Sequence, residues 1–139
     1  MIYLDTAAIV KLLRPEPETA ELVAWLGERH AQQLMSSTLA EVEVPRALRR
    51  ADPGRLSAVP TVLARINKIE IDATVRATAA AYSDPMLRSL DAIHLASAHS
   101  VVLDGVPLVA FVTYDKRLLD AVERIGLPTA APGMARAGR

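Results

Sequence analysis

The sequence has no cysteine and few aromatic residues. Its 139 residues include one Trp, one Phe and three Tyr, so aromatic side chains make up 4% of the chain. The lack of cysteine excludes disulfides and thiolate-bound metals, and it fits a reducing compartment. The shortage of aromatic rings leaves little material for stacking unpaired bases, so recognition of RNA would have to depend mainly on RNA shape.

Neither sign of charge dominates, and no long apolar run is present. Sixteen Lys and Arg balance sixteen Asp and Glu. No overall field therefore attracts nucleic acid or an anionic membrane, and a polyanion would need a local basic patch. No segment has the apolar length of a membrane span, and the start MIYLD has no basic leader. These features predict a cytoplasmic protein without a membrane partner.

The chain alternates regularly between strand-like and helical segments. Short runs with strand-like apolar residues predict strands at residues 1–4, 33–37 and 106–115, and alternation of charged and apolar residues predicts one at 68–72. Apolar residues at helical spacing predict helices at 6–13, 18–31, 38–50, 56–66, 73–82, 89–102 and 116–125. This alternation indicates an α/β fold, a three-layer α/β/α domain with a central, mostly parallel sheet. We assign the domain to residues 1–131 and expect the small, basic segment 132–139 to form a flexible tail.

Two aspartates follow predicted strands. Asp5 stands at the end of the first strand, and Asp115 follows the longest apolar run, with Thr113 two residues earlier on the same side. Ligands of open α/β sheets bind outside the carboxyl ends of the strands. Each aspartate by itself more often caps the helix that follows it. Remote in sequence, the two could still meet at one edge of the sheet.

Two further carboxylates lie on or beside apolar helix faces. Asp91, in LRSLDAIHLASA, has apolar neighbours at helical offsets, where an unpaired charge is costly, although a charge in the first turn of a helix would also explain it. Glu43, in STLAEVEVPRAL, falls on the apolar stripe, whereas Glu41 lies about 200° away around the helix. We therefore select Glu43. Converging carboxylates repel one another, so a cluster makes physical sense chiefly around a hard divalent cation.

The segments that hold these acids resemble, in order, the four motifs of the PIN-domain family, especially its VapC-type toxins. They are MIYLDTAAIVKLL, SSTLAEVEVPRAL, LRSLDAIHLASA and FVTYDKRLLDAV, and they span nearly the whole chain. The resemblance implies a PIN-like fold and a Mg²⁺-dependent endoribonuclease, with Mn²⁺ able to substitute, whose products carry 5′-phosphate and 3′-hydroxyl ends. It also implies inhibition by a VapB-like antitoxin and a homodimer. The acids of such a site correspond to Asp5, Glu43, Asp91 and Asp115.

As a hypothesis, three aspartates hold one or two Mg²⁺ ions directly or through water: Asp5, Asp91 and Asp115. Glu43 then orients a ligand water or completes a second ion site. The hydroxyls of Thr6 and Thr113 are expected to support these ligands. The chain departs from the family pattern at Ala7, where such toxins commonly carry Ser. It also departs from it at Pro45, two residues after Glu43.

Positive charge that could face RNA is concentrated in one part of the chain. Its members are Arg46, Arg49, Arg50, Arg55, Arg65 and Lys68. Arginines on helix surfaces are ordinary, so residues next to the acidic motifs carry more weight. We expect contacts to RNA from Arg46, Arg49, Arg88 and Lys116.

The apolar residues of the first two predicted helices suggest where partners bind. Most of this stripe is expected to be core, although part of it could receive an antitoxin helix. The stripe consists of Ile9, Leu12, Leu13, Leu22 and Leu26, with Trp25 beside them. A homodimer interface could use the face around Trp25 or residues 73–82.

Three alternatives compete with the nuclease interpretation. His94, three residues after Asp91, could join it in a site for a softer transition metal. A non-catalytic RNA-binding or protein-interaction domain could use the same acids as caps and ion-pair partners, and failure to bind Mn²⁺ would favour it. A phosphatase-like fold usually requires a second acid two residues after the first, where this chain has Ala7.

Overall fold

A five-stranded parallel sheet forms the middle layer of the structure, a computed structural model that describes residues 1–135. The strands are β1 (Ile2–Leu4), β2 (Leu34–Ser37), β3 (Asn67–Ile69), β4 (Ala110–Val112) and β5 (Thr129–Ala130). Their order is β3-β2-β1-β4-β5, and every neighbouring pair is parallel. β1 is central, and its carboxyl end lies between those of β2 and β4.

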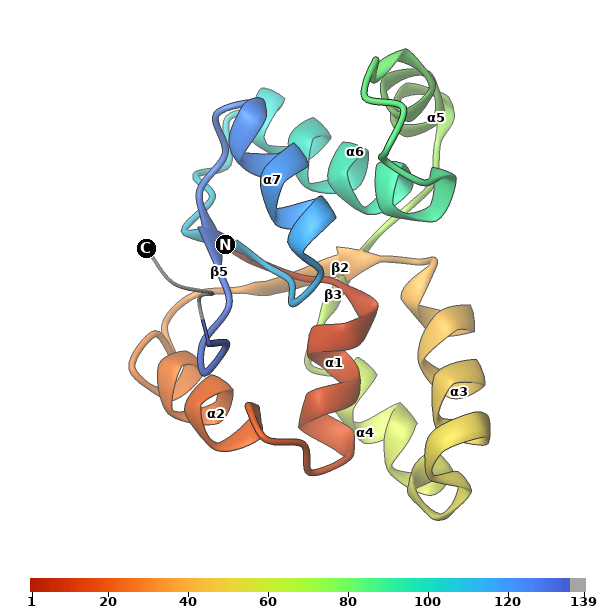
Figure 1. The fold of residues 1–139 in the computed structure, drawn as a ribbon, viewed down its shortest axis with the longest axis vertical. Helices are drawn as coiled ribbons and strands as arrows, with labels where there is room; N and C mark the ends of the chain where they lie inside the picture. The colour runs from red at the N-terminus through yellow and green to blue at the C-terminus, as the bar shows by residue number, and fades with distance from the viewer. Residues whose placement is uncertain (136–139) are drawn as a thin grey trace.

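Helices cover both faces of this sheet (Figure 1). One layer contains α1 (Thr6–Leu13), α2 (Thr19–Gly27), α3 (Ala40–Ala51), the 3₁₀ helix η1 (Pro53–Ala58) and α4 (Val59–Leu63). The opposite layer contains α5 (Ala73–Ala81), α6 (Ser89–Leu103) and α7 (Lys116–Arg124). The predicted three-layer α/β/α architecture is confirmed.

Several element boundaries differ from the sequence-based predictions. Of the apolar run 106–115, only Ala110–Val112 forms a strand, because its partner β1 offers just three residues. The helix predicted over 56–66 is a 3₁₀ turn followed by a short helix, with Pro60 in the first turn of α4, where a residue without an N–H is tolerated. The two-residue strand β5 was not predicted, because it carries no apolar run.

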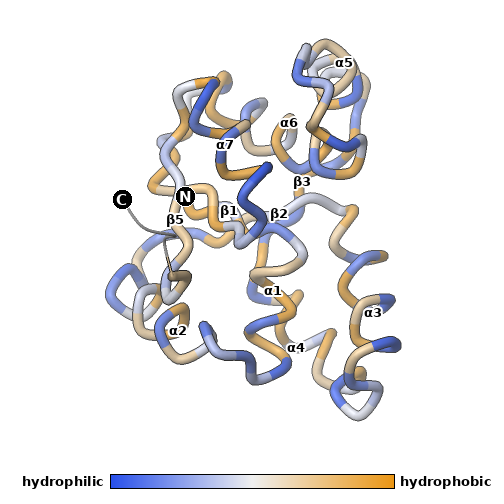
Figure 2. Tube along the Cα trace, in the orientation of Figure 1, coloured by the Kyte–Doolittle hydropathy of each residue, from blue (hydrophilic) through white to orange (hydrophobic). Residues whose placement is uncertain are grey.

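The alternation of side chains along β1 divides the interior into two cores. Ile2 and Leu4 face the α1 layer and belong to one fully buried cluster with Ile9. Tyr3, between them, faces the α6 layer, where its ring stacks on Phe111 with centroids 4.7 Å apart. The helix α3 is also divided into a polar and an apolar side, and Figure 2 shows its hydrophilic residues on the side away from α1. β1 is therefore buried on both faces, as expected for a central parallel strand.

The C-terminal end of the described chain contacts the domain. The Tyr114 hydroxyl donates a hydrogen bond to the Pro132 carbonyl at 2.9 Å, and the Met134 N–H donates to the Ala131 carbonyl at 3.0 Å. Residues 136–139 lie outside the described part, so the flexible tail at 132–139 stays a prediction. Among the described helices, none has both the length and the apolar character needed to cross a membrane.

Candidate functional site

Asp5 and Asp115 both lie at the carboxyl edge of the sheet because β1 and β4 are paired neighbours. Leu4 is in register with Val112, and the Asp5 N–H donates to the Val112 carbonyl at 3.2 Å. Both aspartates also cap helices: Asp5 Oδ1 accepts from the Ala8 N–H at 2.9 Å, and Asp115 Oδ1 accepts from the Arg117 N–H at 2.8 Å. Capping engages one oxygen of each carboxylate. The capping and ligand roles are therefore compatible.

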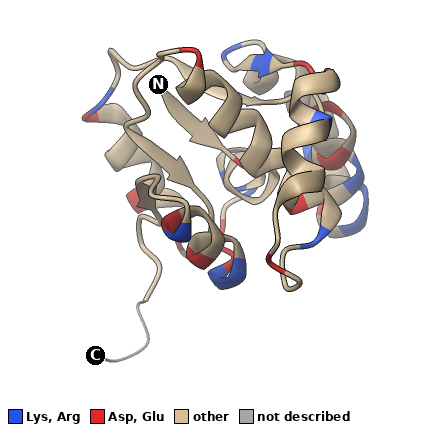
Figure 3. Cartoon of the chain, turned by 90° about the horizontal axis from the view of Figure 1, so that it is seen from above, with Lys and Arg blue, Asp and Glu red and all other residues tan. Residues whose placement is uncertain are grey.

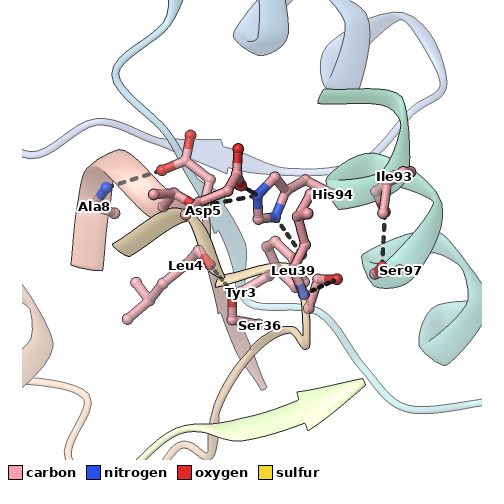
Figure 4. A network of polar contacts seen from close by, with 12 residues as sticks. Tyr3, Leu4, Asp5, Ala8, Ser36, Leu39, Ile93, His94 and Ser97 are labelled. Carbon is pink, nitrogen blue, oxygen red and sulfur yellow. Dashed lines mark hydrogen bonds and ion pairs between the residues drawn. The ribbon is translucent and has the colours of Figure 1, made fainter. Parts of the chain in front are cut away.

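Glu43 is oriented by two side chains from different elements. It lies on α3 and reaches the start of α1, where the Thr6 hydroxyl donates to its Oε1 at 2.7 Å. His94 Nε2, from α6, lies 2.7 Å from the same oxygen. The ring of His94 lies beside Tyr3, and Asp5 with its bond to Ala8 is close by (Figure 4). Residues far apart in the chain thus meet around one carboxylate.

Asp91 stands in the first turn of α6, and an arginine links it to Asp115. Arg88 Nε lies 3.7 Å from Asp91 Oδ2, and its terminal nitrogen lies 3.8 Å from Asp115 Oδ2. The Arg88 side chain is 73% exposed, so these ion pairs are screened by water and weak. The guanidinium offsets part of the negative charge while staying accessible from outside.

Burial and neighbouring charges perturb two of the aspartates. Burial raises the pKa of Asp5 above its usual range, and the charge of Asp91 adds to this, while the Thr113 hydroxyl and His94 oppose it. Burial also raises the pKa of Asp91, and the charges of Asp115 and Glu43 raise it further against the opposition of Arg88 and His94. Asp91 is therefore coupled to all three of the other acids.

Glu43 behaves differently from the aspartates. Burial by itself would raise its pKa, but the hydrogen bonds from His94 and Thr6 outweigh burial and bring the pKa below the usual range. The carboxylate form is thus stabilised where two donors converge on it. The surroundings of Glu43 therefore favour its ionised form, whereas burial and like charges disfavour the ionised forms of Asp5 and Asp91.

The donor chemistry of the group fits a hard divalent cation. Its ligands are carboxylate oxygens, which Mg²⁺ prefers, and a cation would relieve the repulsion that raises the pKa of Asp5 and Asp91. As the side chains are placed in residues 1–135, no three His, Asp or Glu groups lie close enough to hold an ion between them. Coordination by all three aspartates would therefore involve bridging water or movement of the carboxylates toward one another.

The alternative of a softer metal bound by Asp91 and His94 is wrong. Both ring nitrogens of His94 are already engaged, Nδ1 with the Tyr3 hydroxyl at 2.7 Å and Nε2 with Glu43 at 2.7 Å. No nitrogen is left to coordinate a metal. The position of His94 three residues after Asp91 reflects helix geometry rather than shared ligation.

The missing hydroxyl at Ala7 has little consequence for Glu43. Ala7 is exposed, whereas Thr6 points inward and supplies the hydrogen bond to Glu43. Sequence analysis missed the roles of Tyr3 and His94 in this part of the site. The available signals were the apolar surroundings of His94 and the alternation that turns Tyr3 to the opposite face from Ile2 and Leu4.

Some of the basic residues considered for RNA contact are exposed, whereas Lys68 is held by hydrogen bonds within the fold. Arg46, Arg49 and Lys116 are exposed, and Figure 3 shows basic and acidic residues interspersed over the surface. Lys68 does not belong to an RNA-facing rim, because its ammonium donates to the carbonyls of Leu63 at 2.8 Å and Ile66 at 3.1 Å. It holds the turn between α4 and β3.

Known proteins resemble this chain in sequence and in fold. Residues 2–124 match the model of the PIN domain. The chain is 53% identical over 136 residues to "Ribonuclease VapC35" of Mycobacterium tuberculosis, a match that covers 98% of this chain and all of the relative. It is 41% identical over 139 residues to "Ribonuclease VapC47" of the same species, covering 98% of this chain and all of that relative. A crystal structure of FitAcB from Neisseria gonorrhoeae has a TM-score of 0.70 at 19% identity, covering 96% of this chain and 98% of that one.

Proposed function

Since this chain belongs to the PIN-domain family and is a VapC-type ribonuclease toxin of a VapBC toxin-antitoxin system, we propose that it cuts RNA internally with the help of Mg²⁺ at the carboxyl edge of its sheet. The family is typically metal-dependent, and Mn²⁺ is expected to replace Mg²⁺. The observation that carries the proposal is geometric: Asp5 and Asp115 follow the paired strands β1 and β4, and Arg88 lies 3.7 Å from Asp91 and 3.8 Å from Asp115.

Each acid has a role that follows from its surroundings. Asp5, Asp91 and Asp115 are proposed to hold the cation, directly or through water, because Asp5 and Asp115 follow the paired strands β1 and β4 and Arg88 lies near both Asp91 and Asp115. When bound, such an ion supplies charge stabilisation for a phosphodiester attacked by water. Glu43, kept ionised and fixed by Thr6 and His94, orients that water or takes up its proton. Thr113 supports Asp5 with its hydroxyl.

The decisive experiment is cleavage of structured, end-labelled RNAs by the purified chain freed of any bound partner. We expect cutting in Mg²⁺ or Mn²⁺, with 5′-phosphate and 3′-hydroxyl ends, and none in excess EDTA or with the Asp91→Asn variant. The exposed Glu41→Gln variant, also on α3, is the matched control and should cut normally. Intact RNA in every sample, together with no Mn²⁺ binding by calorimetry, would favour a non-catalytic RNA-binding or protein-interaction domain.

Arg88 is proposed to contact a substrate phosphate beside the cleavage position. Its guanidinium lies between Asp91 and Asp115 and is largely exposed. We expect Arg88→Ala to weaken RNA binding and to lower the slope of log affinity against log salt by about one. Filter binding on the Asp91→Asn background measures this without cleavage. Arg124→Ala, whose similarly exposed arginine pairs with Asp84, serves as the control, and an unchanged salt slope for Arg88→Ala would exclude the contact.

The proposed partners are an RNA substrate, a VapB-like antitoxin and a second copy of the chain. The antitoxin is expected to lay an apolar helix on a groove of about 360 Å³ between α1, α2 and α4, which is lined by Leu12, Val23, Leu26 and Val62. Trp25 is less suited to an interface than its type suggests, because Arg29 already stacks on its ring at 4.1 Å. A homodimer is therefore better placed at α5, within residues 73–82. We propose action in the cytoplasm, where RNA is available.

A further inference from the structure

Tyr3 and His94 are two buried polar side chains next to the site, and the bond from His94 to Glu43 does not explain why Tyr3 is present. Tyr3 is fully buried and His94 is 2% exposed. Burying polar groups costs free energy unless they are hydrogen-bonded, and apolar residues of similar shape would fill the space at less cost. The Tyr3 hydroxyl and His94 Nδ1 are 2.7 Å apart, and His94 continues to Glu43 at 2.7 Å. The pair therefore connects the core to the proposed reacting carboxylate.

The protons in this chain of hydrogen bonds have one consistent order. An ionised carboxylate only accepts, so His94 Nε2 carries the hydrogen that lies between it and Glu43. In a neutral imidazole the other nitrogen, Nδ1, is then an acceptor, and the Tyr3 hydroxyl donates to it. Burial raises the pKa of Tyr3, so the phenol keeps its proton.

The neighbouring hydroxyls do not compete for this acceptor. Ser36 and Ser97 border the Tyr3 hydroxyl, but Ser36 donates to the Leu4 carbonyl at 2.7 Å and Ser97 donates to the Ile93 carbonyl at 2.7 Å. Tyr3 is left as the donor to Nδ1. The imidazole tautomer is thus set by a residue on β1, although the ring belongs to α6.

We propose that Tyr3 and His94 are positioning residues, with Tyr3 fixing the His94 tautomer and His94 fixing the direction of the Glu43 carboxylate. Thr6 and His94 both donate to Oε1, so the carboxylate is held through one oxygen and neither of these donors occupies the second. The inference rests on the proposed function, because it takes Glu43 as the group that orients water. Losing such a support commonly costs about 10- to 100-fold in activity.

The kinetic test compares substitutions that remove or replace the donor. We expect His94→Leu to lower kcat for RNA cleavage by about 10- to 100-fold while KM changes less than about threefold. His94→Gln, whose amide can still donate, should recover part of the loss, and Tyr3→Phe should lose less than His94→Leu. On a Glu43→Ala background, adding His94→Leu should cause no further loss, because the residue acts through Glu43.

Stability is controlled by a double variant. His94→Leu alone leaves the buried Tyr3 hydroxyl without its partner, which is destabilising. The combination of Tyr3→Phe with His94→Leu removes both polar groups and keeps the apolar volume. It should fold, as judged by circular dichroism, and show the same fall in kcat. Wild-type kcat in this folded double variant would overturn the proposal.

Ring ¹⁵N chemical shifts of the histidines give a readout that does not depend on cleavage. At a pH where the imidazole ring is neutral, we expect His94 to show a protonated Nε2 and an unprotonated, hydrogen-bonded Nδ1, and we expect this signature to be lost in Tyr3→Phe. His30, whose ring lies near the Gly27 carbonyl at the surface, is the internal control and should not change. A proton on Nδ1 instead, or additive kinetic losses with Glu43→Ala, would refute the inference. Failure of the proposed function is distinguishable, because the wild-type chain would then leave RNA uncut while the tautomer is still measured.

Discussion

Replacing Asp5 by Asn is expected to lower RNA cleavage by about 10³-fold, because a ligand charge that supports several kcal/mol of transition-state stabilisation is lost. The substitution separates this charge from the structural role of the residue. Asp5 Oδ1 accepts the Ala8 N–H at the start of α1, and Asn caps a helix about as well as Asp does. Single-turnover cleavage in saturating Mg²⁺ measures the loss, and residual activity within tenfold of wild type would exclude Asp5 as a ligand.

The same variant should be more stable than the wild-type chain when no divalent ion is present. Burial raises the pKa of Asp5, so the folded state disfavours its charge and the wild-type protein loses stability as the pH rises through the carboxyl range. Asn carries no charge and avoids this cost. We expect the melting temperature in EDTA to rise by about 4 °C at neutral pH, the shift that ~1 kcal/mol produces in a domain of this size.

The pH dependence of this gain has a definite sign. The difference between Asp5→Asn and wild type should be largest at neutral pH and should shrink as the pH falls below the raised pKa of Asp5, where the wild-type carboxyl is protonated as well. Mg²⁺ should stabilise the wild type and not the variant. If the variant were less stable than wild type at neutral pH, the prediction would be wrong. The contacts of the Asp5 carboxylate would then stabilise the fold by more than the burial of its charge destabilises it.

Phe111→Ala is expected to destabilise the fold by about 4 kcal/mol, the usual effect of truncating a fully buried aromatic residue. Phe111 lies in the middle of β4, is 0% exposed and stacks on Tyr3. Its removal leaves a cavity between the central strands and the α6 layer. Because small domains are stable by only about 5–15 kcal/mol, the variant should unfold at much lower urea concentration. Val42→Ala, at a position 58% exposed on α3, should change the free energy of unfolding by less than about 0.5 kcal/mol.

Urea unfolding followed by circular dichroism decides this prediction. A loss below about 1 kcal/mol would mean that the two cores relax to fill the space vacated by Phe111, since the cost of truncation depends on how well a site can collapse. A second consequence concerns the site. β4 leads directly to Thr113 and Asp115, so cleavage by Phe111→Ala should fall at temperatures where the variant is still mostly folded.

Much of the candidate site could be selected from local sequence because its signals are local. Strand-to-helix boundaries placed Asp5 and Asp115 after β1 and β4, and helical spacing separated Glu43 from the exposed Glu41. Hydrophobic periodicity depends on residues within a few turns of one another. The architecture and the acids to consider were therefore available before any tertiary contact was known.

The contacts that give the site its chemistry were decided only by the tertiary structure. The hydrogen bond between Tyr3 and His94 joins residues 91 positions apart, and the one between His94 and Glu43 joins residues 51 apart. The capture of Lys68 by nearby carbonyls, which removes it from the basic rim, is likewise invisible in its sequence. Such pairings depend on strand order and on the packing of helices across a sheet, which no local pattern encodes. The sequence by itself thus determined the fold class and the candidate acids, whereas three-dimensional packing determined how one of them is aimed.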